Sequence, residues 1–177
     1  MKKTTLIGLL LSMLAVLSVF GCGGGGGGTP PPPQPTIAVI KISADGTLPQ
    51  DTAIGGVNIT LNLPSGVTVK ASPSVNPDVL ITDPGVVVPS GAAVNASAPE
   101  NRYDAATKQV TISVVQADGF LTGEFVTVTC DIAVGSFPKA ADFSLGTFQA
   151  YGINLINSET VDITAALPTR SFTASIN

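Results

Sequence analysis

The sequence contains no histidine and no tryptophan, and only two of its 177 residues are cysteines. Without histidine a serine–histidine–acid triad cannot form, and a zinc site would have to be built from carboxylates and a cysteine. Charged residues make up 11% of the chain. These absences argue against an enzyme, so we predict a non-catalytic binding protein that uses no metal and no cofactor.

The acidic residues that remain do not change this prediction. Asp118 and Glu124 flank one loop, where paired carboxylates could in principle hydrolyse a glycosidic bond. Acids beside a turn are more often ordinary solvated charges in an acidic extracellular protein. Asp45-Gly46 and Asp118-Gly119 lack the further ligands of a calcium loop, so we interpret both pairs as turns.

The N-terminus has the layout of a secretory signal. Lys2 and Lys3 form its charged start, and the apolar run from Leu6 to Phe20 is short for a membrane span. Val19-Phe20-Gly21-Cys22 resembles the lipobox of bacterial lipoproteins. The resemblance implies a signal peptide over residues 1–21 and a diacylglycerol on Cys22, which would make the membrane a partner of the mature chain.

The residue after the cysteine bears on location. Gly23 stands there instead of aspartate, and in lipoproteins of double-membraned bacteria this pattern implies sorting to the outer membrane. We therefore expect a cell-envelope lipoprotein of the outer membrane, facing either the periplasm or the cell surface. An ordinary secretory signal cut near Gly21, with Cys22 left free, is the alternative.

A tether follows over residues 22–35. Gly23–Gly28 should form a flexible coil with a span of about 13 Å, and Pro30–Pro35 an extended polyproline II segment of about 19 Å. We interpret the proline run as a spacer that holds the following domain away from the lipid.

Residues 36–177 have the length of one domain. Removing Lys2 and Lys3 with the signal leaves six basic residues against twelve acidic ones, a net charge of −6. This balance argues against nucleic acid or an anionic lipid surface as the partner, since both need a basic footprint. If Cys22 is acylated, Cys130 is the only thiol left, and an intramolecular disulfide is excluded.

Apolar residues alternate with polar ones along several segments of this domain. A period of two is typical of strands with one buried face. The clearest runs are Ile59, Leu61, Leu63; Val110, Ile112, Val114; and Val126, Val128, Cys130, Ile132, Val134. An early strand at Val39-Ile40 and a closing one through Phe172, Ala174 and Ile176 extend the series. We place Cys130 in the core as a small, inert hydrophobe.

Turn-forming residues separate the runs, at Asp45-Gly46, Pro64-Ser65-Gly66, Asp83-Pro84-Gly85, Ser90-Gly91, Asp118-Gly119 and Gly135-Ser136. No helical periodicity of useful length occurs outside the signal. Each one-sided sheet must bury its apolar face against another sheet. The predicted fold is therefore all-β, an antiparallel two-sheet β-sandwich.

The order of these segments resembles the cohesin domain and the related carbohydrate-binding-module superfamily. The resemblance lies in Ile54–Pro64, in Lys108–Phe120 followed by Gly123–Ile132, and in Asp142–Gly152. It covers nearly the whole domain and implies a nine-stranded, jelly-roll-like sandwich whose exposed sheet face docks a partner. In cohesins this partner is the calcium-loaded dockerin, for which this chain has no repeated calcium loop of its own.

Two kinds of partner follow from these patterns. We expect an unknown protein, bound through a face of the sandwich, with a polysaccharide as the alternative. Sugar binding usually needs an aromatic platform, and Tyr103 and Tyr151 are the candidate surface residues for it. Amide side chains could add hydrogen bonds to a ligand, although solvated outer-face positions explain them as well. These amides are Asn58, Asn62, Gln109, Gln116 and Gln149.

Overall fold

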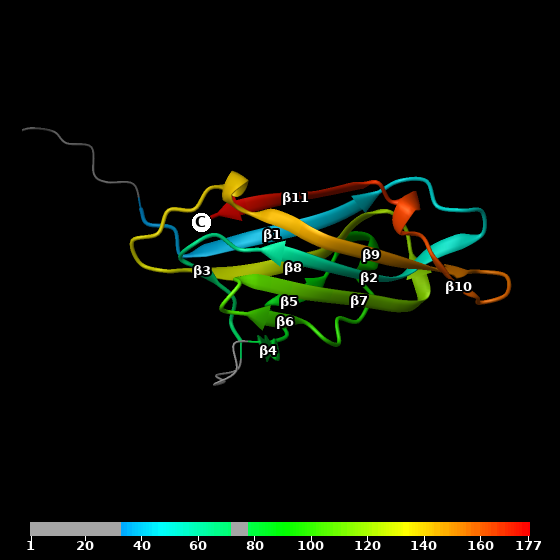
Figure 1. Cartoon of the computed structure of the whole chain (residues 1–177), viewed down its shortest axis with the longest axis horizontal. Coiled ribbons are helices and arrows are strands. Elements are labelled where there is room, and N and C mark those ends of the chain that lie inside the picture. Colours follow the sequence, from blue (N-terminus) through cyan, green and yellow to red (C-terminus); the bar gives the residue numbers. More distant parts are fainter. Residues whose placement is uncertain (1–32, 72–77) are drawn as a thin grey trace, which may run out of the picture. The chain divides into compact units, whose positions relative to one another are not determined.

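A computed structural model describes residues 33–71 and 78–177 (Figure 1). The predicted signal peptide at 1–21, the predicted lipid-attachment residue Cys22 and residues 23–32 of the tether lie outside these ranges. Pro33–Asn177 form one compact unit. Within the two described ranges, no helix combines the length and the apolar character needed to cross a membrane.

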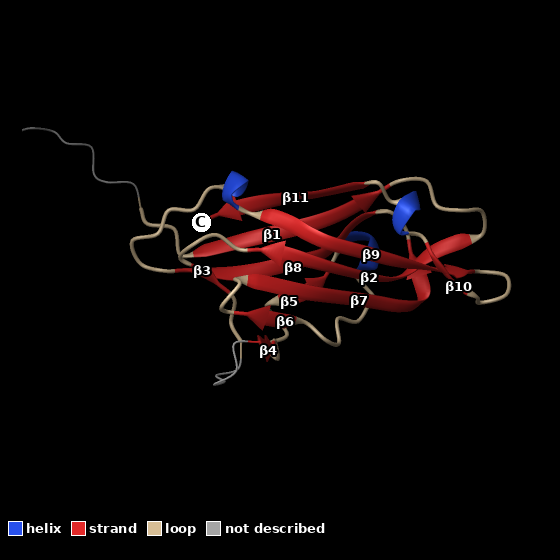
Figure 2. Cartoon of the chain, in the orientation of Figure 1, coloured by secondary structure: helices blue, strands red, loops and turns tan. Residues whose placement is uncertain are grey.

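Strands account for most of the described residues, and the helices among them are three 3₁₀ turns of three residues each (Figure 2). The strands are β1 (Ile37–Asp45), β2 (Thr52–Asn62), β3 (Val67–Thr68), β4 (Asp78–Leu80), β5 (Val87–Pro89), β6 (Arg102–Asp104), β7 (Gln109–Phe120), β8 (Gly123–Ile132), β9 (Ser144–Asn154), β10 (Thr160–Asp162) and β11 (Thr169–Ile176). The 3₁₀ turns are η1 (Gly91–Ala93), η2 (Ala140–Asp142) and η3 (Thr164–Ala166).

The strands form two sheets in which neighbours run antiparallel. The five-stranded sheet has the order β11-β1-β8-β3, with β5 also paired to β8. The six-stranded sheet has the order β10-β9-β2-β7-β6-β4. This arrangement confirms the predicted all-β, two-sheet fold.

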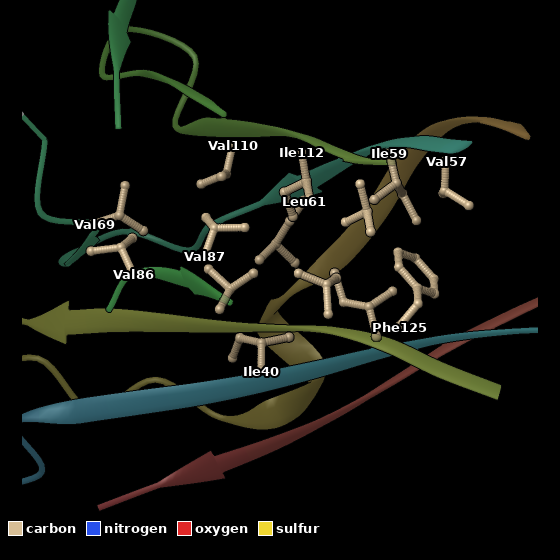
Figure 3. Close-up of a cluster of buried hydrophobic side chains, with 14 of the residues drawn as sticks. Ile40, Val57, Ile59, Leu61, Val69, Val86, Val87, Val110, Ile112 and Phe125 are labelled. Atoms are coloured by element: carbon tan, nitrogen blue, oxygen red, sulfur yellow. The ribbon is translucent and has the colours of Figure 1, made fainter. Parts of the chain in front are cut away.

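The alternation seen in the sequence becomes the inner face of each sheet. Ile40 and Ile42 on β1 and Val110, Ile112 and Val114 on β7 are completely buried. Figure 3 shows such side chains from several strands gathered into one apolar cluster. Burying one residue of this size contributes about 1.5–3 kcal/mol, so the two inner faces supply much of what holds the sheets together.

Two sequence predictions about strand ends are wrong. Val134 was expected to continue the buried alternation of β8, but it is 93% exposed. β8 ends at Ile132, and the chain turns immediately afterwards, with Gly135 in the left-handed region at φ +83°. A glycine there avoids the backbone strain that a side chain would cause.

Asp118-Gly119, predicted as a turn, instead lies inside β7, within a long bulge. Ile54 pairs with Phe120, and Gly56 pairs with Val115, so four residues of β7 lie opposite Gly55 alone. The bulge brings Phe120 onto the inner face, where it is 4% exposed. The turn between β7 and β8 comes later, at Leu121 and Thr122.

The number of strands also differs from the cohesin expectation. The described ranges contain eleven strands in place of nine. Strands of only two or three residues, β3, β4 and β5, pair at the sheet margins and raise the number. Such short pairings depend on tertiary contacts, and no sequence periodicity can mark them.

Candidate functional site

Tyr103 does not lie on the surface, so this part of the sequence prediction is wrong. It is the middle residue of β6, its cross-strand partner is the fully buried Val110, and only 6% of it is exposed. Burial raises the pKa of its phenol. The three-residue strand was too short to show by alternation which way Tyr103 faces.

Tyr151 occupies a different position. It lies on β9 between the buried residues Ala150 and Gly152, is itself half-buried, and pairs with Gly56 on β2 and with Asp162 on β10. Since Gly56 has no side chain, nothing on β2 stands directly beside the tyrosine ring. A ligand-binding role for Tyr151 stays a prediction.

The outer face of the six-stranded sheet presents an accessible surface of one chemical kind. Its three central strands place uncharged polar side chains there, because these residues alternate with the buried ones. We call this set the polar face: Asn58, Thr60 and Asn62 of β2; Gln109, Thr111 and Ser113 of β7; and Thr147 and Gln149 of β9.

Some groups of the polar face bind one another. The hydroxyls of Thr60 and Thr147 are 2.8 Å apart, and Asn62 Nδ2 donates to Ser144 Oγ at 3.0 Å. A bulge in β9 opposite Thr60 brings Thr147 into this position. These two contacts link β9 to β2 at the end of the face that contains Thr60 and Asn62.

Other groups of the face remain free. Asn58 and Gln149 are directly opposite each other and exposed, yet neither amide has a side-chain hydrogen bond to another described residue. Thr111 of β7, which pairs with Thr60 of β2, is likewise exposed. Each amide offers two hydrogen-bond donors and an acceptor, and the hydroxyl can donate or accept a hydrogen bond. This centre can therefore bind a polar partner without first breaking internal bonds.

A shallow pocket of about 320 Å³ lies over the free groups. Asp162 forms part of its margin, and its Oδ1 accepts a hydrogen bond from the backbone N–H of Thr164 at 2.8 Å. Hydrogen bonds from Thr164 lower the pKa of Asp162. The pocket is lined by Asn58, Ile59, Thr60, Thr111, Thr147, Phe148, Gln149, Asp162 and Thr164.

Sequence reasoning named the amides Asn58 and Gln149 but did not single out Thr60, Thr111, Thr147 or Asp162. Alternation could have shown that Thr60 and Thr111 face outward. It could not show that β2 and β7 are neighbours, which depends on pairing between distant segments. Gln116, another amide named from sequence, lies in the β7 bulge, where its Nε2 donates to the backbone carbonyl of Gly119 at 2.7 Å.

The reactive groups of the domain are held elsewhere. Cys130 is completely buried, and burial raises the pKa of its thiol to about 12. The Glu124 carboxylate is engaged by Lys41 Nζ at 3.3 Å and by Ser90 Oγ at 2.7 Å, contacts typical of a structural ion pair. The described residues contain no group of three or more histidine, cysteine and acidic side chains that could hold a metal.

Comparison with known proteins assigns no function to this chain. No family model and no curated protein matches this sequence. Among solved structures, the chain is similar to a non-cellulosomal cohesin from the hyperthermophilic archaeon Archaeoglobus fulgidus, with a TM-score of 0.44 and 12% identity. The likeness covers 73% of this chain and 75% of that chain. At these values it says nothing of what this protein binds.

Proposed function

We propose that this chain is a lipid-anchored binding module of the bacterial cell envelope that recognises a protein through its polar face and catalyses no reaction. Cys22 carries the anchor, the Gly/Pro tether provides reach, and the sandwich provides the binding surface. An outer-membrane location, facing the periplasm or the cell surface, follows from the same signal and from Gly23.

The observation that carries the proposal is a cluster of exposed amide and hydroxyl groups at the centre of the sheet that form no side-chain hydrogen bond to another described residue. Asn58, Gln149 and Thr111 line a shallow pocket. Asp162, at its margin, is the one charged residue among those that line it. Backbone and side-chain amides of a protein partner present the same kind of donors and acceptors. The interface would resemble the polar, hydrogen-bonded parts of other protein–protein surfaces.

A polysaccharide is the second candidate, favoured by Tyr151 on the same side of β9 as the face. Tyr151 is the cross-strand partner of Asp162, and Asp162 lines the pocket together with Asn58 and Gln149. An aromatic ring can stack on one sugar while neighbouring polar groups bind its hydroxyls. Since Tyr103 is buried, the polar face offers one aromatic ring in place of the expected two. Because the second aromatic ring is missing from the surface, we favour a protein partner over a polysaccharide.

The test uses the soluble chain Pro33–Asn177, which contains every described strand and the whole apolar cluster. The chain is immobilised and exposed to envelope extract of its own organism, and in parallel to a glycan array. We expect a stoichiometric protein complex that Thr111→Glu abolishes, because the substitution puts an unpaired charge among the uncharged groups at the centre of the polar face. The matched control is Thr173→Glu on the other sheet, which should bind normally.

Three results would contradict the proposal. If Thr111→Glu binds as well as the unmodified chain, the polar face is not the binding surface. If the chain binds a glycan and Tyr151→Ala removes that binding, the sugar reading replaces it. Turnover of any substrate by the purified chain overturns the non-catalytic assignment.

A further inference from the structure

The edges of the two sheets differ sharply in length. Edge strands tend to pair with other chains, and proteins discourage this with short edges, prolines and charges. Among the described residues, the outer strands β3, β4, β5 and β10 have only two or three residues each. β5 ends in Pro89, and β4 begins at Asp78, which binds Arg102 at 2.9 Å.

β11 is the exception, an edge strand of eight residues. It pairs with β1 in unbroken register from Thr169 to Ile176, without a bulge. It contains no proline, and Arg170 is its one charged residue. In an antiparallel pair, alternate residues turn their N–H and C=O groups away from the partner. On β11 these groups point outward along the free edge.

No described residue binds that free edge through its backbone. η2 lies against β11, near its C-terminal end in Figure 1, but the backbone hydrogen bonds of η2 stay within its own turn. The edge therefore offers a row of unpaired donors and acceptors.

The inward side chains of β11 are also incompletely covered. Phe172, Ala174 and Ile176 pack against the core but remain half-buried, as does Phe148 of β9. The guanidinium of Arg170 lies 5.3 Å from the centre of the Phe148 ring. A strand added beside β11 would extend the inner face and remove more of this apolar surface from water.

We propose that β11 pairs antiparallel with β11 of a second copy of this chain, joining two five-stranded sheets into one. The two-fold axis must pass midway between the two copies of one β11 residue, so that this residue lies opposite itself. Only then do the inner faces of both copies lie on the same side of the joined sheet. An axis at Thr173 pairs Arg170 to Ile176, which is seven of the eight residues of β11. This inference goes beyond the polar face and does not depend on it.

The residues of β11 are self-complementary in this register. Phe172 lies opposite Ala174 of the other copy, Ser171 opposite Ser175, and Thr173 opposite itself, so hydroxyls meet hydroxyls and a large apolar side chain meets a small one. Arg170 lies opposite Ile176, which keeps the two arginines at opposite ends of the interface. It also brings each Arg170 to the end of the neighbouring β11 where η2 carries Asp142.

The first experiment measures the mass of the soluble chain Pro33–Asn177 by sedimentation over a range of concentrations. We expect a concentration-dependent dimer. Thr173→Glu should weaken it about fivefold, because the substitution places two like charges opposite each other. Within each copy the new carboxylate faces Lys41, its partner on β1, so the fold is retained. Thr111→Glu, with the same charge on the other sheet, should leave the dimer unchanged.

A second experiment locates the axis. Residues directly opposite in an antiparallel pair have Cβ atoms about 4.5–5.5 Å apart, within reach of a disulfide. Thr173→Cys should therefore form a covalent dimer under mild oxidation, whereas Ser171→Cys should not. Cys130 is completely buried and will not interfere.

Several outcomes overturn this proposal. A chain that stays monomeric at every concentration excludes the pairing, and so does a dimer that Thr173→Glu leaves unaffected. Cross-linking through Ser171→Cys but not Thr173→Cys rules out the axis. If β11 amides become protected from exchange only when a different protein is added, the edge belongs to that protein. Since Thr111→Glu disrupts the polar face alone, failure of either proposal leaves the other intact.

Discussion

Replacing Asn101 with alanine should destabilise the sandwich far more than its single polar side chain suggests. Asn101 is 4% exposed and is the one fully buried polar residue among those described. Its Nδ2 donates to the Ala98 carbonyl at 2.9 Å, and its Oδ1 accepts from the backbone N–H of Ser113 at 3.0 Å. Pairing of β6 with β7 ends at Arg102 and Thr111, so the side chain of Asn101 continues the ladder by one step.

The expected cost follows from what alanine leaves behind. The Ser113 N–H and the Ala98 C=O both lose their partner. Each such loss costs about 1–3 kcal/mol when the group is fully buried, and somewhat less here because both residues are only partly buried. We therefore expect the free energy of unfolding to fall by about 2–5 kcal/mol for Asn101→Ala. For a unit of this size, that corresponds to a drop in Tm of roughly 6–15 °C.

Urea unfolding followed by far-ultraviolet circular dichroism measures this effect, since the chain has no tryptophan to report by fluorescence. The midpoint should fall while the m value stays the same. Asn62→Ala is the matched control, because it removes one exposed hydrogen bond, to Ser144 Oγ, and should cost less than about 1 kcal/mol. Equal stability of the two variants would refute the reasoning.

Two further predictions concern ionisable groups. Because burial raises the pKa of Cys130 to about 12, the folded chain Pro33–Asn177, which lacks Cys22, should not react with a thiol reagent at pH 8 and should react once unfolded. Rapid labelling of the folded chain would contradict this. Hydrogen bonds from Thr107 and Ala106 lower the pKa of Asp104 below its ordinary value of 3.8. The stability it contributes is therefore present above about pH 4 and is lost as the pH falls through the lower folded pKa. The Tm difference between the unmodified chain and Asp104→Ala should shrink from pH 6 towards pH 2, and a constant difference would argue against this linkage.

The long strands could be predicted because the alternation of apolar and polar residues along each strand indicates which side chains are buried. Val110, Ile112 and Val114 mark the inner face of β7, and Thr111 between them must then face outward. The same reasoning predicted that Cys130 lies in the core, and the structure confirms it. Each of these inferences needs only the period of two, which neighbours in sequence carry by themselves.

The candidate site could be predicted only in part. Asn58 and Gln149 were recognised as outer-face amides, but their position opposite each other depends on the pairing of β2 with β9. These strands are about ninety residues apart along the chain. The pocket further requires a β9 bulge, which places Thr147 against Thr60, and a β10 strand that brings Asp162 to its margin. None of these features leaves a periodic signal.

The sequence by itself determined that the domain is built from one-sided strands, because alternating apolar residues can be buried only on one face of a sheet. It also determined the chemistry available, since a chain without histidine has few reactive groups to arrange. Tertiary structure decided which strands are neighbours, that Tyr103 faces inward, that Val134 faces outward and that β11 is a long edge strand of its sheet. The physical reason is that strand pairing joins backbone groups of distant segments, and these groups are the same in every residue except proline.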